Sequence, residues 1–153
     1  MVLLAGDVGG TKTLLGLFER GAPRPRAIVS RAYPTADYPN FTAILDAFAG
    51  DVAQPLAIEA VAVGVAGPVI RGRAALTNIS WDISATEVTA RFDTPRVRLL
   101  NDLAAMATSV ARSRSLKTAI PPSLAGAVGW FNHLRRAQSA GGSASAKVPS
   151  RNP

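Results

Sequence analysis

The chain has 153 residues, enough for one domain with an ordinary buried core but short for two lobes with a cleft between them. Apolar residues make up 48% and charged residues 18%, and no apolar run approaches the ~20 residues that a membrane-spanning helix needs. The chain contains no cysteine, which excludes disulfides, thiolate metal ligands and thiol nucleophiles. These features favour a globular domain with no membrane partner.

The first residues bear on localisation. Residues 1–7 lack a basic stretch and reach a carboxylate too early for a signal peptide. Together with the missing cysteines, which fit a reducing compartment, this predicts a cytoplasmic protein.

The net charge of +7 is unevenly distributed. Residues 1–102 contain all ten acidic residues and ten basic ones, whereas residues 103–153 contain seven basic residues and no acidic one. Because the positive excess lies in the last third, it is weak evidence about what the neutral body binds. We expect no nucleic-acid partner.

The composition changes near residue 113. The chain beyond it is rich in Pro, Gly, Ser and Ala, which predicts a folded lobe over 1–113 and a basic, disordered tail over 114–153. Within this tail, residues 124–136 space their apolar side chains as a short amphipathic helix would. A change of reading frame would explain why residues 103–153 lack Asp and Glu, and we keep this as a hypothesis.

Three short apolar runs open the chain at residues 2–7, 13–18 and 27–32, separated by turn-forming residues. This pattern predicts three consecutive strands joined by hairpins. Asn40 then precedes a stretch with apolar residues on one helical face, and Gly50 follows it. We predict a helix that Asn40 caps and Gly50 stops.

The rest of the lobe alternates strands and helices. The predicted elements are a strand over 60–65, a hairpin through 71–73, a helix from Ser84 to about Phe92, a strand over 97–100 and a helix over 103–112. Ser84 with Glu87 three residues later is a capping-box pattern. The order predicts an α/β domain with a mixed sheet whose three leading strands are antiparallel.

Residues 6–13, Gly-Asp-Val-Gly-Gly-Thr-Lys-Thr, carry the first chemical motif. The two adjacent glycines would let backbone N–H groups approach an anion, and Thr11 and Thr13 would add hydroxyl donors. The segment nearly matches the Walker A spacing, but Thr11 replaces its second glycine, and a strand rather than a helix is predicted next. We therefore predict a β-hairpin turn that faces phosphates. A plain Gly-Gly hairpin turn remains the alternative.

The second motif is Asn101-Asp102, just past a predicted buried strand. The carboxyl ends of such strands are where α/β sheets bind ligands. Asp102 is a candidate general base that would take a proton from a substrate hydroxyl, and the Asn101 amide can hydrogen-bond sugar hydroxyls. The alternative is that either residue only caps the following helix.

The ordered set of motifs resembles the bacterial glucokinases, a family of the actin-like ATPase superfamily. The resemblance covers residues 3–107, roughly two-thirds of the chain. Its motifs are Gly6-Asp7-Val8-Gly9-Gly10-Thr11, Val65-Ala66-Gly67-Pro68, Leu76-Thr77-Asn78 with Trp81, and Leu100-Asn101-Asp102.

The resemblance implies an actin-like (ribonuclease H-like) lobe that phosphorylates glucose at its 6-hydroxyl with ATP, the reaction by which glucose enters glycolysis. It implies that Gly6, Asp7, Val8, Gly9, Gly10 and Thr11 bind ATP and that Asp7 orients Mg²⁺. Asp102 matches the family's catalytic base and glucose contact, and Asn101 matches a glucose ligand. Thr77, Asn78 and Trp81 would shape the wall near the sugar. For full-length members of the family, the resemblance also allows a homodimer.

One feature leaves the substrate open, and another argues against a repressor. Lys12 stands where an Asn is common in the glucokinases and resembles the related sugar-kinase and repressor family, so another hexose is an alternative substrate. A repressor would need an N-terminal helix-turn-helix, for which the residues before Asp7 leave no room.

The resemblance also implies a second lobe, and nothing after residue 107 matches one. Phosphoryl transfer depends on positioning and electrostatic stabilisation from both sides of a closed cleft. We therefore expect little turnover from this chain. A noncatalytic fragment or pseudogene product is the main alternative.

Overall fold

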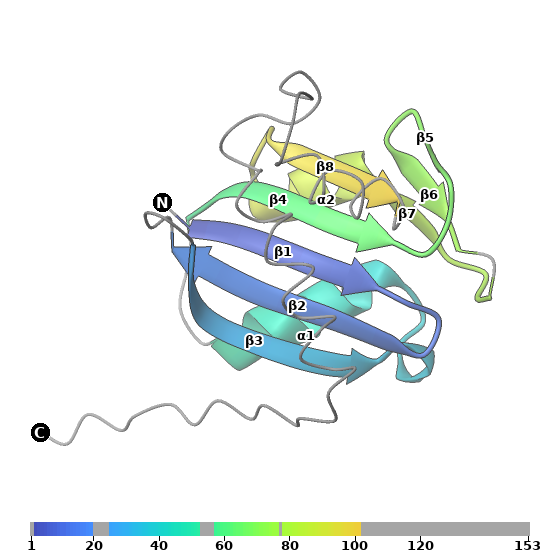
Figure 1. The fold of residues 1–153 in the computed structure, drawn as a ribbon, viewed down its shortest axis with the longest axis horizontal. Helices are drawn as coiled ribbons and strands as arrows, with labels where there is room; N and C mark the ends of the chain where they lie inside the picture. The colour runs from blue at the N-terminus through green and yellow to red at the C-terminus, as the bar shows by residue number, and fades with distance from the viewer. Residues whose placement is uncertain (1, 20–24, 53–56, 77, 102–153) are drawn as a thin grey trace, which may run out of the picture.

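The computed structural model describes residues 2–19, 25–52, 57–76 and 78–101 (Figure 1). Its elements are β1 (Val2–Val8), β2 (Lys12–Glu19), β3 (Arg26–Pro34), the 3-10 helix η1 (Thr35–Asp37), α1 (Phe41–Val52), β4 (Ile58–Val65), β5 (Val69–Ile70), β6 (Arg73–Ala75), β7 (Asp82–Ser84), α2 (Ala85–Phe92) and β8 (Val97–Asn101). In these ranges no helix is long and apolar enough to cross a membrane. The predicted helix over 103–112 and the tail over 114–153 lie outside the described residues.

The main sheet has five strands in the order β3-β2-β1-β4-β8. Strands β1, β2 and β3 pair antiparallel, whereas β4 pairs parallel with β1 and β8 pairs parallel with β4. Strands β5, β6 and β7 form a second, antiparallel sheet beside the end of β8 (Figure 1). The predicted mixed sheet with three leading antiparallel strands is confirmed.

The larger core cluster lies between one face of the main sheet and both described helices, which run behind the sheet in Figure 1. The buried side chains of α1 in this cluster are Phe41, Ile44, Leu45 and Phe48. Their spacing puts them on one helical face, and burying that face stabilises the helix more than its intrinsic propensity does. Alternate residues of β1, such as Leu4 and Val8, face the same cluster.

The opposite face of the sheet carries a smaller cluster of five buried side chains. They are Leu3, Ala5, Phe18, Ala60 and Ala62. Because successive side chains of a strand point to opposite faces, Asp7 shares this face with Leu3 and Ala5. Asp7 therefore lies at the carboxyl end of β1, on the side of the sheet away from α1.

Helix α1 begins as predicted and ends later than predicted. The Asn40 side-chain oxygen accepts a hydrogen bond from the Ala43 N–H at 2.9 Å, which confirms the N-cap. The predicted stop at Gly50 is wrong, because the helix continues to Val52. Tyr33 on β3 holds this last turn by donating a hydrogen bond from its hydroxyl to Asp51 Oδ2 at 2.7 Å. Burial, followed by this bond, raises the Tyr33 pKa.

The predicted hairpin through residues 71–73 is confirmed between β5 and β6. Arg71 and Gly72 both have positive φ, 50° and 75°, so they form the two-residue turn whose twist suits a hairpin. The Gly72 oxygen accepts a hydrogen bond from the Ala85 N–H at 2.8 Å. The hairpin is thereby fixed to the start of α2.

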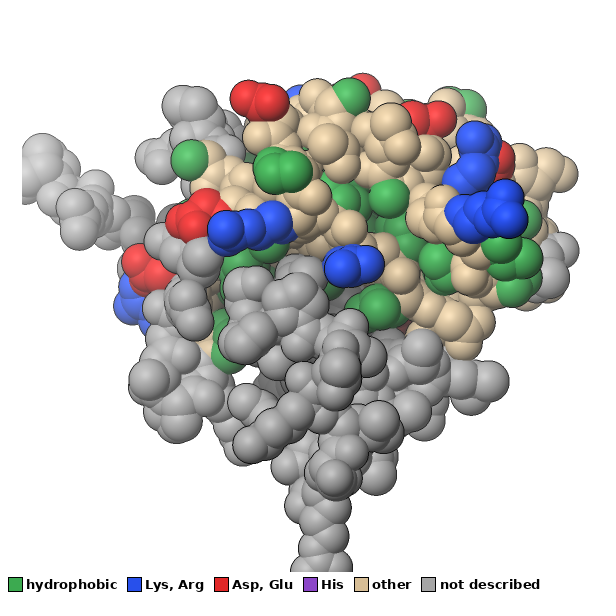
Figure 2. All heavy atoms as spheres, turned by 90° about the horizontal axis from the view of Figure 1, so that it is seen from above, with side chains coloured by type: hydrophobic (Ala, Val, Ile, Leu, Met, Phe, Trp, Pro, Cys, Tyr) green, Lys and Arg blue, Asp and Glu red, His purple; other side chains and the backbone are tan. Residues whose placement is uncertain are grey.

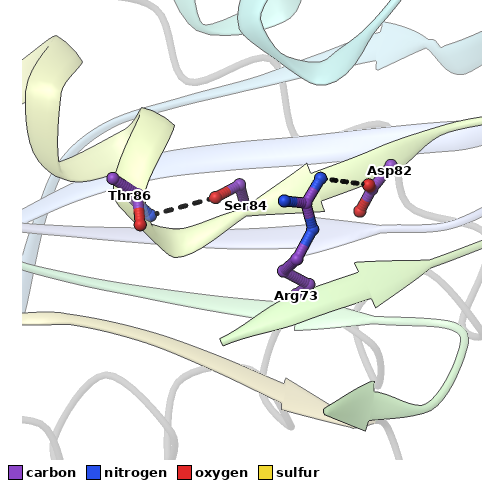
Figure 3. A network of polar contacts seen from close by, with 4 residues as sticks. All are labelled: Arg73, Asp82, Ser84 and Thr86. Atoms are coloured by element: carbon purple, nitrogen blue, oxygen red, sulfur yellow. Dashed lines mark hydrogen bonds and ion pairs between the residues drawn. The ribbon is translucent and has the colours of Figure 1, made fainter. Parts of the chain in front are cut away.

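Strand β7 was not predicted, because its three residues are too few to show an alternating pattern. Arg73 on β6 forms an ion pair with Asp82 on β7 (Figure 3). Ser84 caps α2 as predicted, but its hydroxyl oxygen accepts from the Thr86 N–H at 3.2 Å, one residue before the position in a capping box. Helix α2 ends at Phe92 as expected.

Candidate functional site

The candidate site lies where three parallel strands end. Val8 at the end of β1 is the register partner of Val65 on β4, which is in turn the partner of Asn101 on β8. The chain segments that follow these three residues therefore leave the sheet at the same edge. This is the edge at which open α/β sheets bind ligands.

The turn between β1 and β2 has an unusual distribution of hydrogen bonds. The Gly9 N–H donates to the Lys12 oxygen at 3.0 Å, and the Thr35 N–H donates to the Thr11 oxygen at 3.0 Å. The Thr35 hydroxyl donates to the Gly9 oxygen at 2.9 Å. Within the described part of the chain, the N–H groups of Gly10 and Thr11 donate to no partner.

This distribution suits an anion. Two carbonyl oxygens of the turn, those of Gly9 and Thr11, are engaged by Thr35, while Thr11 is exposed and Gly10 is half-buried. Adjacent backbone N–H donors that lack internal partners form the kind of concavity that binds phosphate oxygens. The turn is therefore chemically fit to hold a phosphate.

The two glycines of the turn are needed for close approach and not for positive φ. Gly72 is the one glycine with positive φ among the described residues, so Gly9 and Gly10 use ordinary backbone conformations. A Cβ on Gly9 would lie 3.1 Å from the Lys12 oxygen, and a Cβ on Gly10 would lie 3.2 Å from the Asn78 Cβ. Gly10 therefore brings the turn against the chain segment around Asn78.

The last three residues of β1 precede the turn and differ in burial and in the face of the sheet on which they lie. They are Gly6, Asp7 and Val8. Val8 is fully buried in the core cluster, and its backbone oxygen accepts from the Ala66 N–H at 3.2 Å. A Cβ on Gly6 would lie 2.9 Å from Leu15 Cδ2, so this glycine makes room for a core side chain. Asp7 is half-buried on the other face. Of these three residues, Asp7 is the one with a side chain that is not buried in the core.

The expectation that Thr13 adds a hydroxyl donor to the turn is wrong. Thr13 is fully buried, and its hydroxyl lies 2.9 Å from the Thr35 hydroxyl. Since the single Thr35 hydroxyl proton goes to Gly9, Thr13 must be the donor in this pair. Its proton is thus used beneath the turn, and Thr11 is the remaining exposed threonine.

Sequence reasoning missed Thr35, which makes the three hydrogen bonds just described. No motif marks it. The signal lay in the register of the sheet, because Pro34 at the end of β3 pairs with Lys12 at the start of β2. Thr35, the first residue after β3, must then lie beside Thr11.

The segment predicted to form a wall near the sugar is partly at the site. Asn78 is exposed and lies against Gly10. Trp81 is only 8% exposed and belongs to the core cluster, so its indole supports the segment from inside. Its backbone oxygen accepts from the Leu76 N–H at 3.1 Å. Thr77 lies outside the described residues.

Asn101 reaches the end of the neighbouring strand. Its Nδ2 donates to the Gly67 oxygen at 2.6 Å. Gly67 itself is closely packed, because a Cβ there would lie 2.4 Å from the Ala75 oxygen. Asn101 therefore fixes the segment after β4. Asp102, the candidate base, lies outside the described residues.

The metal expectation at the site rests on Asp7. Figure 2 shows acidic and basic side chains interspersed on the face that it presents. In the part of the chain that the structure covers, no three His, Cys, Asp or Glu side chains gather as a metal centre would require. An Mg²⁺ ion bound through Asp7 would therefore take its other ligands from phosphates and water, as Mg²⁺ commonly does.

Comparison with known proteins gives a consistent result. The glucokinase family model matches residues 4–120. A glucokinase of Nostoc punctiforme is 34% identical over 106 residues, which cover 69% of this chain and 31% of the relative. A glucokinase of Caulobacter vibrioides is 32% identical over 109 residues, covering 71% of this chain and 33% of the relative. The chain thus spans about a third of the length of these curated relatives.

Solved structures agree on the fold. A glucokinase from an Antarctic psychrotroph superposes with a TM-score of 0.63 at 24% identity, covering 71% of this chain and 34% of that one. A ROK family glucokinase from Streptomyces griseus, solved with glucose and AMPPNP, superposes with a TM-score of 0.52 at 28% identity, covering 73% and 36%. The fold is that of the actin-like ATPases, to which the ROK sugar kinases belong.

Proposed function

The chain belongs to the glucokinase family, and from this premise we propose that it serves the ATP-dependent phosphorylation of glucose to glucose 6-phosphate. One observation carries the proposal. At the edge where β1, β4 and β8 end, Thr35 engages the Gly9 and Thr11 oxygens of the turn after β1, and the Gly10 and Thr11 N–H groups have no partner among the described residues. Such a turn at that edge fits a phosphate site.

We assign the nucleotide to residues 6–11. The N–H groups of Gly10 and Thr11 would bind phosphate oxygens, and the Thr11 hydroxyl would add a third donor. Asp7 would orient Mg²⁺ through the carboxylate at the end of β1. ATP supplies the phosphoryl group, and Mg²⁺ supplies positive charge against the phosphates when both are bound.

We assign glucose to the neighbouring segments. Asn78 is exposed beside Gly10, so its amide would face a sugar bound next to the phosphates. Asn101 stands at the end of β8, where one amide proton holds the Gly67 oxygen. Asp102 follows directly and would accept the proton of the 6-hydroxyl as that oxygen attacks phosphorus.

Several finer points belong to the same proposal. The folded lobe extends to residue 113, and residues 114–153 form a separate tail. The reaction takes place in the cytoplasm without nucleic acid or membrane as partner. Another hexose is an alternative substrate, because Lys12 matches the related sugar kinases better than the glucokinases.

Binding without turnover is a second candidate function. It is favoured by the extent of the match, which covers about a third of each relative. Phosphoryl transfer needs groups from both sides of a cleft. Acting alone, this part of a glucokinase would bind its ligands weakly and transfer phosphate slowly.

Titration of the full chain tests the proposal, with backbone amide NMR shifts as the readout. We expect Mg·ATP to shift the Gly10 and Thr11 amides and glucose to shift the Asn78 amide, while Thr94 at the far end of the sheet stays unmoved. MgCl₂ alone is the control for the ion. The Gly10→Val variant should lose the nucleotide shifts, because its side chain must displace Asn78. Unmoved turn amides at millimolar Mg·ATP would contradict the nucleotide assignment.

A further inference from the structure

We infer that Thr35 is a positioning residue that holds the β1–β2 turn in the conformation in which the Gly10 and Thr11 N–H groups are presented to a ligand. Thr35 is fully buried and lies 24 residues or more along the chain from the turn it contacts. It touches no ligand in this assignment. Its effect is exerted through Gly9 and Thr11.

The hydrogen bonds of Thr35 form a directed chain. Thr13 donates its hydroxyl proton to the Thr35 hydroxyl oxygen at 2.9 Å, and the Thr35 hydroxyl donates to the Gly9 oxygen at 2.9 Å. The Thr35 N–H donates to the Thr11 oxygen at 3.0 Å. Both carbonyls are thus directed toward Thr35. The peptide units to which they belong carry the Gly10 and Lys12 N–H groups and are fixed with them. The Thr11 N–H belongs to the peptide unit between these two.

The chain segments on either side of Thr35 are themselves held in place. It is the first residue of η1, directly after β3. Two residues earlier, Tyr33 is bonded to Asp51 in α1, and its ring meets that of Tyr38 edge to face, with centroids 5.8 Å apart. The chain before Thr35 is therefore attached to α1 through Tyr33, and the chain after it packs on the Tyr33 ring through Tyr38. A group anchored in this way can impose a conformation on a turn.

The consequence for binding rests on the proposed function. A turn whose carbonyls are free to rotate would present oxygen to a phosphate in part of its population, and that fraction would not bind. When Thr35 holds these carbonyl oxygens by hydrogen bonds, the fraction of molecules that cannot bind phosphate becomes smaller. Thr35 should therefore raise the affinity for a phosphate ligand without contributing a contact to it.

Thr35→Val tests the inference because it keeps the shape and the backbone N–H and removes the hydroxyl. Thr35→Ser keeps the hydroxyl and serves as the rescue. Thr94→Val is the matched control, since Thr94 is also buried and also donates its hydroxyl to a backbone oxygen, that of Glu59, at 2.9 Å. That bond lies at the opposite end of β4 from the site.

The first readout is amide hydrogen exchange of the full chain without nucleotide. Thr35→Val should speed exchange of the Gly9 amide by about tenfold relative to the Ala5 amide, because one bond that closes the turn is gone. Thr35→Ser and Thr94→Val should leave this ratio within about threefold of the parent. An unchanged ratio in a folded Thr35→Val variant would overturn the inference, whatever the chain binds.

The second readout is the affinity for Mg·ATP, measured by the same amide shifts. Where the parent binds, Thr35→Val should weaken binding about tenfold and Thr35→Ser should restore it, while Thr94→Val has no effect. Equal weakening by Thr94→Val would show a general loss of stability and contradict a positioning role. A parent that binds no Mg·ATP would refute the nucleotide assignment, and the exchange measurement would still decide whether Thr35 holds the turn.

Discussion

Asn101 and Gly67 are joined by a hydrogen bond of 2.6 Å from the side-chain Nδ2 to the backbone oxygen. The bond links the end of β8 to the segment that follows β4, across the edge where the candidate site lies. Asn101 is therefore a structural link as well as a proposed sugar ligand.

Replacing Asn101 by Asp tests the structural link without changing the size of the side chain. Asp has the same size, but it would set a carboxylate oxygen against the Gly67 oxygen. We expect the free energy of unfolding to fall by about 1 kcal/mol, because the half-buried Gly67 oxygen loses its donor and faces a carboxylate. Urea denaturation measures it. Asn40→Asp is the control, because Asp caps a helix as well as Asn does; equal effects of the two changes would contradict the link.

Two glycines should respond oppositely to the same substitution. Gly67→Ala would place a Cβ 2.4 Å from the Ala75 oxygen, and backbone would have to shift, so we expect a loss of about 2 kcal/mol or more. Gly50 is exposed in α1 with nothing within 4 Å of an added Cβ, so Gly50→Ala should stabilise by about 0.5 kcal/mol. Thermal unfolding of both variants checks the contrast, and a stable Gly67→Ala protein would show that the packing is looser than described.

Tyr33 should make stability depend on alkaline pH. Its pKa is raised in the folded protein, so above pH ~10 the unfolded chain releases this proton while the folded chain retains it. The stabilisation is present below pH ~10 and decreases above it, by at most about 1.4 kcal/mol per pH unit. Urea denaturation from pH 8 to 11 should show the parent losing its advantage over Tyr33→Phe. A constant difference would mean that the Tyr33 proton is not retained.

The proposed boundary at residue 113 predicts the result of a truncation. Residues 114–153 are rich in Pro, Gly, Ser and Ala and contain no Asp or Glu, a composition typical of a disordered tail. Removing residues 114–153 should therefore change the free energy of unfolding by less than about 1 kcal/mol. A large loss would place a packed element in the removed segment.

The sequence was informative where a pattern repeats along several residues. The apolar runs at residues 2–7 and 60–65 and the Asn40 cap were sufficient to predict strands β1 and β4 and the start of α1, because burial and capping act over short spans of chain. The turn at Arg71-Gly72 was also recognisable from its glycine.

It was uninformative where a contact depends on how strands pair. Thr35 reaches Gly9 only because β2 and β3 pair in one particular register, and no local pattern encodes that register. The same holds for the approach of Asn78 to Gly10 and for the bond between Asn101 and Gly67. The helix end at Gly50 was mispredicted for a related reason, since the Tyr33–Asp51 bond holds the next turn.

We propose that this lobe supplies the amino-terminal part of a working glucokinase site. The most direct test fuses residues 1–107 to the remainder of the Nostoc punctiforme glucokinase and measures glucose phosphorylation. We predict an active fusion whose Asp102→Asn form is slower by about 10²–10⁴-fold with folding and glucose binding intact, because Asn cannot accept the hydroxyl proton. A folded but inactive fusion, or an Asp102→Asn form within about tenfold of its parent, would contradict the account.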